Sequence, residues 1–318
     1  MYDLLAILAD GQFHSGTEIG KALGISRAAI WKRMQKVQQV CGCEVESVPG
    51  KGYRLLQQVE LLCLERLQDI CGPGLHVEFL KTVDSTNDYA KRLIREGRHV
   101  DVVFAEEQTQ GKGRRGRAWQ SPYAANLYLS FVWPVSDGMR QLEGLSLVVG
   151  LAVQRCISEL GWADVGLKWP NDVLSNDKKI AGILLELVGD LADQSHVVIG
   201  IGINVNMQGD ISSIDQPWTS IAQEFGHGVS RYEVIRSLIA HLIRLLDELK
   251  ASGFSALQNE WEDKHLWHGK QVVVSSGTSQ IEGQAIGVNE RGELKLKTAD
   301  GVEYIAGGEL SLRLANDS

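Results

Sequence analysis

Apolar residues near the N-terminus recur at helical spacing and are interrupted by turn-forming residues. The pattern predicts a short helix over residues 2–9 and a second over about 17–23, which Gly24 ends. Ser26 is a good N-cap for a third helix that runs to about Gln39. Two helices joined by a tight turn that contains glycine are typical of a helix-turn-helix.

The third predicted helix has one apolar face and one cationic face. Ile30, Met34 and Val37 fall at i, i+4 and i+7, so they are expected to form its buried stripe. Residues 45–55 predict a hairpin with a Gly-rich cationic tip, the wing of a winged helix. A small helical docking domain with a solvated cationic face is the alternative, but the order of helix, turn, helix and wing favours DNA binding. The side chains expected to face DNA are Ser26, Arg27, Trp31, Lys32, Gln35, Lys36 and Lys51.

Beyond this segment, strands and helices alternate without a strict βαβ rhythm. Residues 56–64 lack a Gly/Ser-rich stretch and predict a short, fairly stiff linker. The strand predicted over residues 178–186 is apolar on both faces, which indicates a central place in a sheet. We therefore predict an α+β fold around a mixed sheet. The other predicted elements are strands at residues 77–80, 102–105, 126–133, 165–172 (where a strand runs into a turn) and 196–206, and helices at residues 84–97, 142–160 and 231–249.

The chain changes character from residue 270 onward. Short strands at close spacing, several of them separated by Gly-containing turns, predict a small β-barrel of the SH3-like kind. They lie at residues 271–274, 281–288, 294–297, 302–305 and 310–314. We expect three domains, a winged helix-turn-helix over residues 1–58, a central mixed-sheet domain over 64–267 and the SH3-like domain over 268–318.

Composition sets limits on this picture. The 318 residues include 32 Lys or Arg and 40 Asp or Glu, a net charge of −8 that argues against a chain coating nucleic acid along its whole surface but permits a local basic patch. The five cysteines form no CxxC pair and predict reduced thiols in a cytoplasmic protein rather than disulfides or a zinc site. No apolar run approaches the roughly 18 residues of a membrane span, and no secretion signal is expected.

Three features of the central region are candidates for binding or chemistry. Asp84-Ser85-Thr86-Asn87 is either a simple N-cap cluster or a polar pocket at a helix N-terminus, where hydroxyls and N–H groups meet a neutral polar ligand. Lys179, at the entrance of the central strand, is either a snorkelling edge charge or a functional cation. Glycines in the strand over residues 196–206 let another group approach closely.

Residues 111–117 form a glycine-rich cationic loop. Gly111, Gly113 and Gly116 fit the G-x-G-x-x-G pattern of dinucleotide-binding proteins, but a strand follows where that site requires a helix. The lysine also lacks the following Ser or Thr of a phosphate-binding P-loop. Backbone N–H groups and cations in such a loop can instead wrap a phosphate and a carboxylate. An exposed basic loop without a ligand and a DNA contact are the alternatives.

Five segments, taken in order, form a larger pattern. They are Asp84-Ser85-Thr86-Asn87, Gln108 with Gly111-Lys112-Gly113-Arg114-Arg115-Gly116-Arg117, Lys168-Trp169-Pro170-Asn171-Asp172, Lys179-Ile180-Ala181-Gly182-Ile183-Leu184, and Gly200-Ile201-Gly202-Ile203-Asn204. Together they resemble the motifs of the biotin–protein ligase family, in its bifunctional form that also represses biotin-synthesis genes. Each motif alone is weak and five in sequence are strong, and the resemblance covers essentially the whole chain.

The resemblance implies a role for each matched side chain. The implied catalytic residues are Arg114, Lys179, Lys112 and Asp172. The implied biotin-binding residues are Ser85, Thr86, Asn87 and Gln108, with Lys112, Gly113, Arg114 and Lys179 at the reacting end. The implied ATP or adenylate site comprises Arg115, Arg117, Trp119, Lys168, Asn171, Asn204 and Trp218. Trp218 lies in a loop, residues 210–219, that resembles the family's adenylate-closing segment.

Two of these positions leave a choice open. Lys112 stands where some members of the family have arginine, which keeps the charge but loses bidentate geometry, so Arg114 is the stronger candidate for the carboxylate–phosphate clamp. Asp172 either orients or deprotonates the incoming lysine, or it is a structural residue of the Pro-Asn-Asp turn.

The activity implied by the resemblance is ATP-dependent and forms an amide. Biotin and ATP with Mg²⁺ give biotinyl-AMP, and biotin then passes to a lysine of the biotin carboxyl carrier protein of acetyl-CoA carboxylase. The other implied partners are operator DNA of biotin-synthesis genes and a second copy of the chain, in a homodimer formed when adenylate is bound; no membrane and no resident protein-bound metal are expected. A lipoate–protein ligase and a ligand-sensing repressor that does no chemistry are the competing interpretations.

Overall fold

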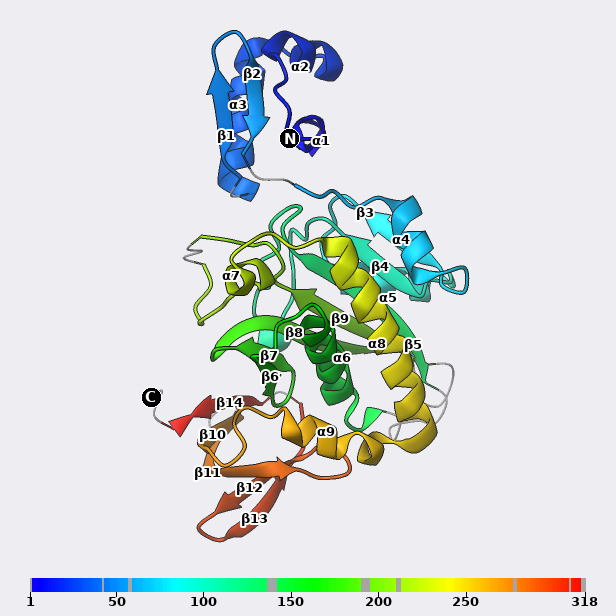
Figure 1. Ribbon diagram of the computed structural model, residues 1–318. Helices are drawn as coiled ribbons and strands as arrows, with labels where there is room; N and C mark the ends of the chain where they lie inside the picture. The colour runs from blue at the N-terminus through cyan, green and yellow to red at the C-terminus, as the bar shows by residue number, and fades with distance from the viewer. Residues whose placement is uncertain are drawn as a thin grey trace.

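The computed structural model describes residues 2–41, 43–56, 59–135, 142–189, 195–209, 213–276, 279–308 and 310–315. Three parts follow one another along the chain, with the N-terminal part at one end of a large central domain and the C-terminal sheet at the other (Figure 1). Among the described helices, none has the length and apolar character needed to cross a membrane.

The N-terminal part is a winged helix-turn-helix, as predicted. Ser15 caps the second helix in a reciprocal capping box with Glu18, and Gly24 ends that helix in the left-handed conformation. Ile30, Met34 and Val37 are buried, which confirms the predicted stripe. The elements are α1 (Tyr2–Leu8), α2 (Gly16–Leu23), α3 (Arg27–Cys41), and the antiparallel wing strands β1 (Val45–Val48) and β2 (Gly52–Leu55).

A seven-stranded mixed sheet forms the central domain. Its strand order is β3-β4-β5-β9-β8-β7-β6; β3 and β4 are parallel, and the other described neighbours are antiparallel. The α+β prediction is therefore confirmed. The strands are β3 (Val77–Leu80), β4 (Val102–Ala105), β5 (Leu127–Val135), β6 (Val165–Lys168), β7 (Asp172–Ser175), β8 (Lys178–Val188) and β9 (Ser195–Ile203).

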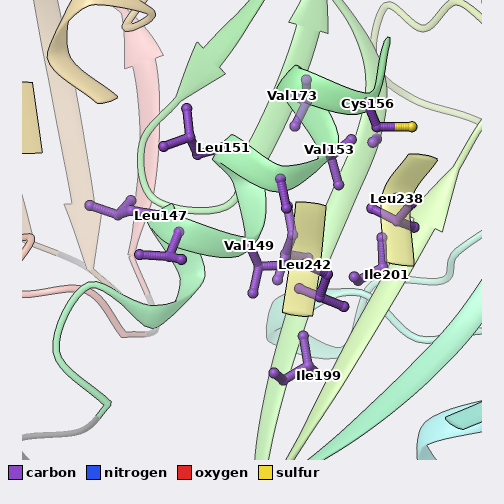
Figure 2. Packing of buried hydrophobic residues seen from close by; sticks show 14 of the residues in the cluster. Leu147, Val149, Leu151, Val153, Cys156, Val173, Ile199, Ile201, Leu238 and Leu242 are labelled. Atoms are coloured by element: carbon purple, nitrogen blue, oxygen red, sulfur yellow. The ribbon is translucent and has the colours of Figure 1, made fainter. Parts of the chain in front are cut away.

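Helices cover both faces of this sheet because its inner strands are apolar on both sides. Helix α5 (Thr86–Arg95) packs Ala90 and Leu93 on one face. Helices α6 (Leu145–Glu159) and α8 (Arg231–Ser252) pack together over the other face, where Figure 2 shows their side chains meeting those of β7 and β9. The shorter helices of this domain are α4 (Leu64–Cys71), α7 (Ile221–Phe225) and α9 (Gln258–Asp263), none of which the sequence pattern predicted.

The structure differs from the prediction at one helix start and by one additional strand in this domain. The helix expected from residue 142 begins at Leu145, because Gly144 adopts a φ of 69° that an α-helix does not allow. The strand predicted in residues 165–172 does run into a turn, after Lys168, but the strand β7 that follows this turn and pairs with β6 and β8 was not predicted. The short polar connection at Asn176 and Asp177, both with positive φ, then turns the chain tightly into β8.

The C-terminal part is a five-stranded antiparallel sheet, which confirms the predicted small β-domain. Its order is β13-β12-β11-β10-β14, and its apolar residues belong to the same core cluster as those of the central domain. Trp169 donates its indole N–H to the Gly292 carbonyl at 3.0 Å, so the two parts are also joined by a buried hydrogen bond. The strands are β10 (Gln271–Ser276), β11 (Ser279–Val288), β12 (Leu294–Thr298), β13 (Gly301–Ile305) and β14 (Ser311–Leu314).

The linker between the winged helix and the central domain is held at several points. The Leu62 N–H donates to a Glu106 carboxylate oxygen at 2.6 Å, and the Cys63 N–H donates to the Tyr232 hydroxyl at 2.8 Å. Helix α1 also docks directly, because Tyr2 stacks on Tyr123 with ring centroids 4.2 Å apart. The predicted stiffness therefore has a structural basis over the described residues 59–63; residues 57 and 58 lie outside the described part.

Candidate functional site

A buried polar cluster lies at the N-terminus of helix α5. Ser85 is the N-cap, and Thr86 and Asn87 in the first turn are buried beside it. The Gln108 side-chain oxygen accepts hydrogen bonds from the Thr86 N–H at 2.9 Å and from its hydroxyl at 3.1 Å. The four residues expected around biotin therefore line one cavity, and the simple N-cap interpretation accounts only for Ser85.

Two side chains that the sequence analysis did not single out complete this cluster. The Ser130 hydroxyl on β5 lies 2.8 Å from the Thr86 hydroxyl and 2.5 Å from the Asn87 side-chain oxygen. The Asn87 amide nitrogen donates to the Glu186 carboxylate on β8 at 2.8 Å. A serine and a glutamate inside otherwise apolar strands were the signal that could have identified them, because a buried polar group needs a partner.

Glycines on β9 make room for the side chains that form the cavity wall. A Cβ at Gly200 would lie 2.5 Å from the Asn87 side chain, and a Cβ at Gly202 would lie 2.5 Å from the Trp119 ring. Any larger residue would displace one or the other. The close approach expected from the glycine pattern is therefore made by Asn87 and Trp119.

The basic loop spans this cavity and a second one beside it. Lys112 pairs with Ala118 in an isolated β-bridge, and the Gly113 N–H donates to the Arg117 carbonyl at 2.7 Å, so the loop is a closed turn. Arg114 donates to the Asn171 side chain at 2.7 Å and to the Leu310 carbonyl at 3.1 Å. Arg114 is thus held between the central domain and the C-terminal sheet.

Two lysines converge on one carboxylate at the junction of the cavities. The Lys179 ammonium lies 2.7 Å from Asp172 and 5.4 Å from the centre of the Trp119 ring. The Lys168 ammonium lies 3.9 Å from Asp172 and 4.5 Å from the Trp267 ring centre. Burial lowers the pKa of Lys168 below its usual value, against the opposing effect of the Asp172 charge. Because its ammonium contacts Asp172, Lys179 does not extend into solvent as a snorkelling side chain would.

The second cavity has a volume of about 760 Å³ and a cationic lining. It shares Gly113, Arg114, Trp119, Asn171 and Lys179 with the first cavity. It brings together the residues expected to bind ATP or adenylate, namely Arg115, Arg117, Lys168, Asn204 and Trp218, with Arg313 from β14. Sequence reasoning missed Arg313 because the pattern assigned its strand only to a separate domain.

Asn204 and Trp218, both expected at the adenylate site, are connected through the loop that carries Trp218. Asn204 donates its amide to the Thr219 carbonyl at 3.0 Å, so this group serves first to hold the loop that carries Trp218. Trp218 itself is bridged to Lys179 through the backbone. Residues 210–212 of the predicted 210–219 closing segment lie outside the described part of the chain.

The side chains expected to face DNA lie together on the winged helix. All seven are exposed, and Trp31 exposes 54% of its surface. Ser26 also accepts a hydrogen bond from the Ala29 N–H at 3.3 Å, which fits the predicted N-cap. Lys51, in the wing, lies 5.7 Å from the Phe13 ring centre. None of the seven lines either described cavity, so the structure separates this face from the polar and cationic site.

The described part of the chain offers no ready-made site for a resident metal ion. No group of three or more His, Cys, Asp or Glu side chains in this part could hold an ion. Asp172 is the carboxylate between the two lysines at the junction, and its oxygens face both ammonium groups. Mg²⁺ usually keeps several waters and binds through substrate phosphates rather than in an all-protein cage, and this donor set fits only that mode.

Comparison with known proteins agrees with this geometry. Three family profiles match, an HTH domain over residues 1–54, the biotin/lipoate A/B protein ligase family over 79–204 and the biotin protein ligase C terminal domain over 268–313. The chain is 39% identical to the bifunctional ligase/repressor BirA of Salmonella typhimurium and to that of Escherichia coli, over 98% of this chain and 97% of each relative. The biotin protein ligase of Aquifex aeolicus, solved with biotin and ATP, is 32% identical, with a TM-score of 0.66 over 76% of this chain and 99% of that one. The chain therefore belongs to the bifunctional ligase/repressor family.

Proposed function

We infer that this protein is an ATP-dependent biotin–protein ligase that also represses transcription through its winged helix. One observation carries the catalytic half. A cavity with hydroxyl and amide side chains at one end adjoins a larger cationic cavity, and Arg114 and Lys179 line both. Such a site suits a neutral ring at one end, a carboxylate at the junction and a nucleotide at the other end.

We propose that biotin lies in the first cavity. Its ureido ring offers both donors and acceptors, which Ser85, Thr86, Asn87 and Gln108 can match with hydroxyl and amide groups. Trp119 packs over the sheet glycines and would cover the apolar part of the ligand. The biotin carboxylate then reaches the junction, where Arg114 and Lys179 lie.

The second cavity is proposed to hold ATP. Lys168, Arg115, Arg117 and Arg313 supply positive charge for the phosphates, and Trp218 supplies an aromatic surface near the adenine. Mg²⁺ would arrive with the ATP phosphates, and its charge would add to that of the arginines.

Two steps follow from this arrangement. A biotin carboxylate oxygen attacks the α-phosphorus, the bond from this phosphorus to the bridging oxygen breaks, and pyrophosphate leaves. The acceptor lysine amine then attacks the anhydride carbonyl carbon, AMP leaves with the electron pair of the broken bond, and the amine nitrogen passes its extra proton to water. Arg114 and Lys179 are proposed to neutralise the reacting oxygens, each worth up to about 3–4 kcal/mol of barrier by analogy with oxyanion donors. The Asp172 carboxylate contacts Lys179, and we propose that it orients the incoming amine.

The partners follow from the two activities. We propose the biotin carboxyl carrier protein of acetyl-CoA carboxylase as acceptor, operator DNA of biotin-synthesis genes as the ligand of residues 1–58, and the cytoplasm as the place where these meet. One winged helix contacts one half-site, so a two-fold operator requires a dimer. We propose that adenylate orders the 111–117 and 210–219 loops and favours dimerisation. The proposed domain limits 1–58, 64–267 and 268–318 are supported by the separate sheets of the three parts.

The decisive experiment measures pyrophosphate release from ATP·Mg²⁺ with either biotin or lipoate. We expect release with biotin and transfer to the carrier protein, and little with lipoate. Release with lipoate alone would overturn the substrate assignment, and no release with either would leave a ligand-sensing repressor.

For the DNA half, the full chain should shift operator DNA, and a chain without residues 1–56 should not. Sedimentation equilibrium with and without biotin plus ATP tests the dimer, for which a coupling of about 1–3 kcal/mol predicts roughly 5- to 150-fold tighter association.

A further inference from the structure

Four charged side chains form a chain of ion pairs beside the biotin cavity. The Lys112 ammonium lies 2.5 Å from one oxygen of Asp88, and the Lys91 ammonium lies 2.8 Å from the other. Lys91 also lies 2.5 Å from a Glu186 oxygen. Asp88, Lys91 and Glu186 are largely shielded from solvent, so these contacts are screened less than ordinary surface pairs.

This network joins three separate parts of the site. Asp88 is in the first turn of α5, directly after Asn87, and Glu186 is the β8 residue that accepts from the Asn87 amide. Lys112 lies in the basic loop. Among the described ion pairs, it is the one residue that this loop contributes to the network. The pair of Lys112 and Asp88 therefore fastens the loop to the helix that carries the polar cluster.

The position of Lys112 makes this contact effective. Its backbone is paired with Ala118 across the base of the loop, and Gly113 and Arg114 follow it directly. A side-chain contact at Lys112 therefore restrains both arms of the turn at once. The ammonium is directed at a carboxylate of the protein, whereas Arg114 donates to the amide of Asn171.

We propose that Asp88 is a positioning residue that holds the basic loop across the biotin cavity through Lys112, and so slows the escape of biotinyl-adenylate. The proposal rests on the proposed function, because it assigns adenylate to this cavity. It also changes the role expected of Lys112, which acts on the loop rather than directly on the reacting oxygens.

The ionisation of the network is consistent with this role. Burial raises the pKa of Asp88, but hydrogen bonds from Lys112 and Lys91 and their charges outweigh it, so the net pKa lies below the usual value. Burial lowers the pKa of Lys91, and its bonds to Asp88 and Glu186 reverse this and raise it. Asp88 and Lys91, the two central members of the network, are thus charged near neutral pH.

The test is a double-mutant cycle on adenylate dissociation. Wild type, Asp88→Asn, Lys112→Met and the double variant are loaded with biotin and ATP·Mg²⁺, and dissociation is followed by tryptophan fluorescence during a chase with excess biotin. We expect each single variant to release adenylate about tenfold faster, which corresponds to about 1.4 kcal/mol. The double variant should be no faster than either single one, because both changes open the same contact.

A matched control separates this effect from a general loss of structure. Glu260→Gln breaks the ion pair with Arg155, which has similar geometry and burial and lies away from both cavities, so it should change release by less than about twofold. The KM for biotin in Asp88→Asn should also stay within about twofold, because the polar cluster is untouched.

Three results would overturn the proposal. They are an unchanged release rate in Asp88→Asn, multiplicative effects in the double variant, or a Lys112→Met enzyme that forms adenylate far more slowly but releases it normally. Lys112→Met approaches the contact from the loop, so the test stands even if Asp88→Asn disturbs helix α5. Failure of the wild-type enzyme to form adenylate would instead count against the proposed function.

Discussion

Replacing Arg231 with methionine is expected to be among the most damaging single changes outside the site. Arg231 is the first residue of α8 and is 0% exposed, and its partner Glu106, after β4, is 1% exposed. The guanidinium contacts both carboxylate oxygens, at 2.6 and 3.1 Å. It also donates to the backbone carbonyls of Glu60, in the linker, and Asn126.

The expected loss of stability follows from the buried Glu106 carboxylate, which the substitution leaves without its counter-charge. In Arg231→Met, the Glu106 carboxylate keeps the Leu62 N–H as a donor but loses its counter-charge in a site closed to water. Removing one partner of a buried pair typically costs about 3–5 kcal/mol. At roughly 2–4 °C per kcal/mol for a domain of this size, Tm should fall by about 6–20 °C.

Differential scanning calorimetry with two further variants tests this reasoning. Arg231→Met combined with Glu106→Gln removes both charges and should recover part of the lost Tm. Arg98→Met, which breaks an exposed pair with Glu78, should cost no more than about 1 kcal/mol. A fall in Tm of less than about 2 °C in Arg231→Met, or a double variant less stable than the single one, would show that the pair is not the buried charge contact described.

Further predictions concern the site and its surroundings. Arg114→Gly should lower adenylate formation or retention by about 10²–10³-fold with little change in Tm, measured as burst pyrophosphate and adenylate release; normal rates would refute the assignment. Lys179→Ala should lower turnover by an order of magnitude or more in steady-state kinetics, whereas near-normal turnover would leave Lys179 only a structural role in its pair with Asp172. His265 is buried, and burial, then the His268 charge, lowers its pKa from 6.5 to about 4. Because the unfolded chain binds this proton first, stability should fall by about 2 kcal/mol between about pH 7.5 and about pH 5, a loss that His265→Leu should remove in urea titrations at both pH values.

Local patterns predicted much of the fold. The stripe of Ile30, Met34 and Val37 needs only helical periodicity, and it is buried as expected. The double-sided apolar strand that contains Lys179 indeed lies inside the sheet, between β7 and β9. These features are encoded by neighbours in sequence, and so a single sequence suffices to find them.

Contacts between distant segments were not predictable in this way. Ser130 reaches Thr86 across 44 positions, and Arg114 reaches the Leu310 carbonyl across 196. Periodicity places such residues on a face of an element but does not say which other element meets that face. The role of Asp88 was hidden for the same reason, because in sequence it is only an acidic residue in the first turn of a helix, where acids are common.

Three consecutive residues connect the parts of the chain at the end of β4. Glu106 binds Arg231 and the linker N–H of Leu62, and the Glu107 carboxylate accepts from the hydroxyl of Tyr2 in α1. Gln108 accepts from Thr86 in the polar cluster. Adjacent Cα atoms are about 3.8 Å apart. The linker, the winged helix and the polar cluster of the biotin cavity are therefore all hydrogen-bonded to one short piece of the chain. Loss of residues 1–56 is therefore expected to loosen Glu107, and with it Gln108, so that biotin binding weakens even though every residue proposed to contact biotin remains.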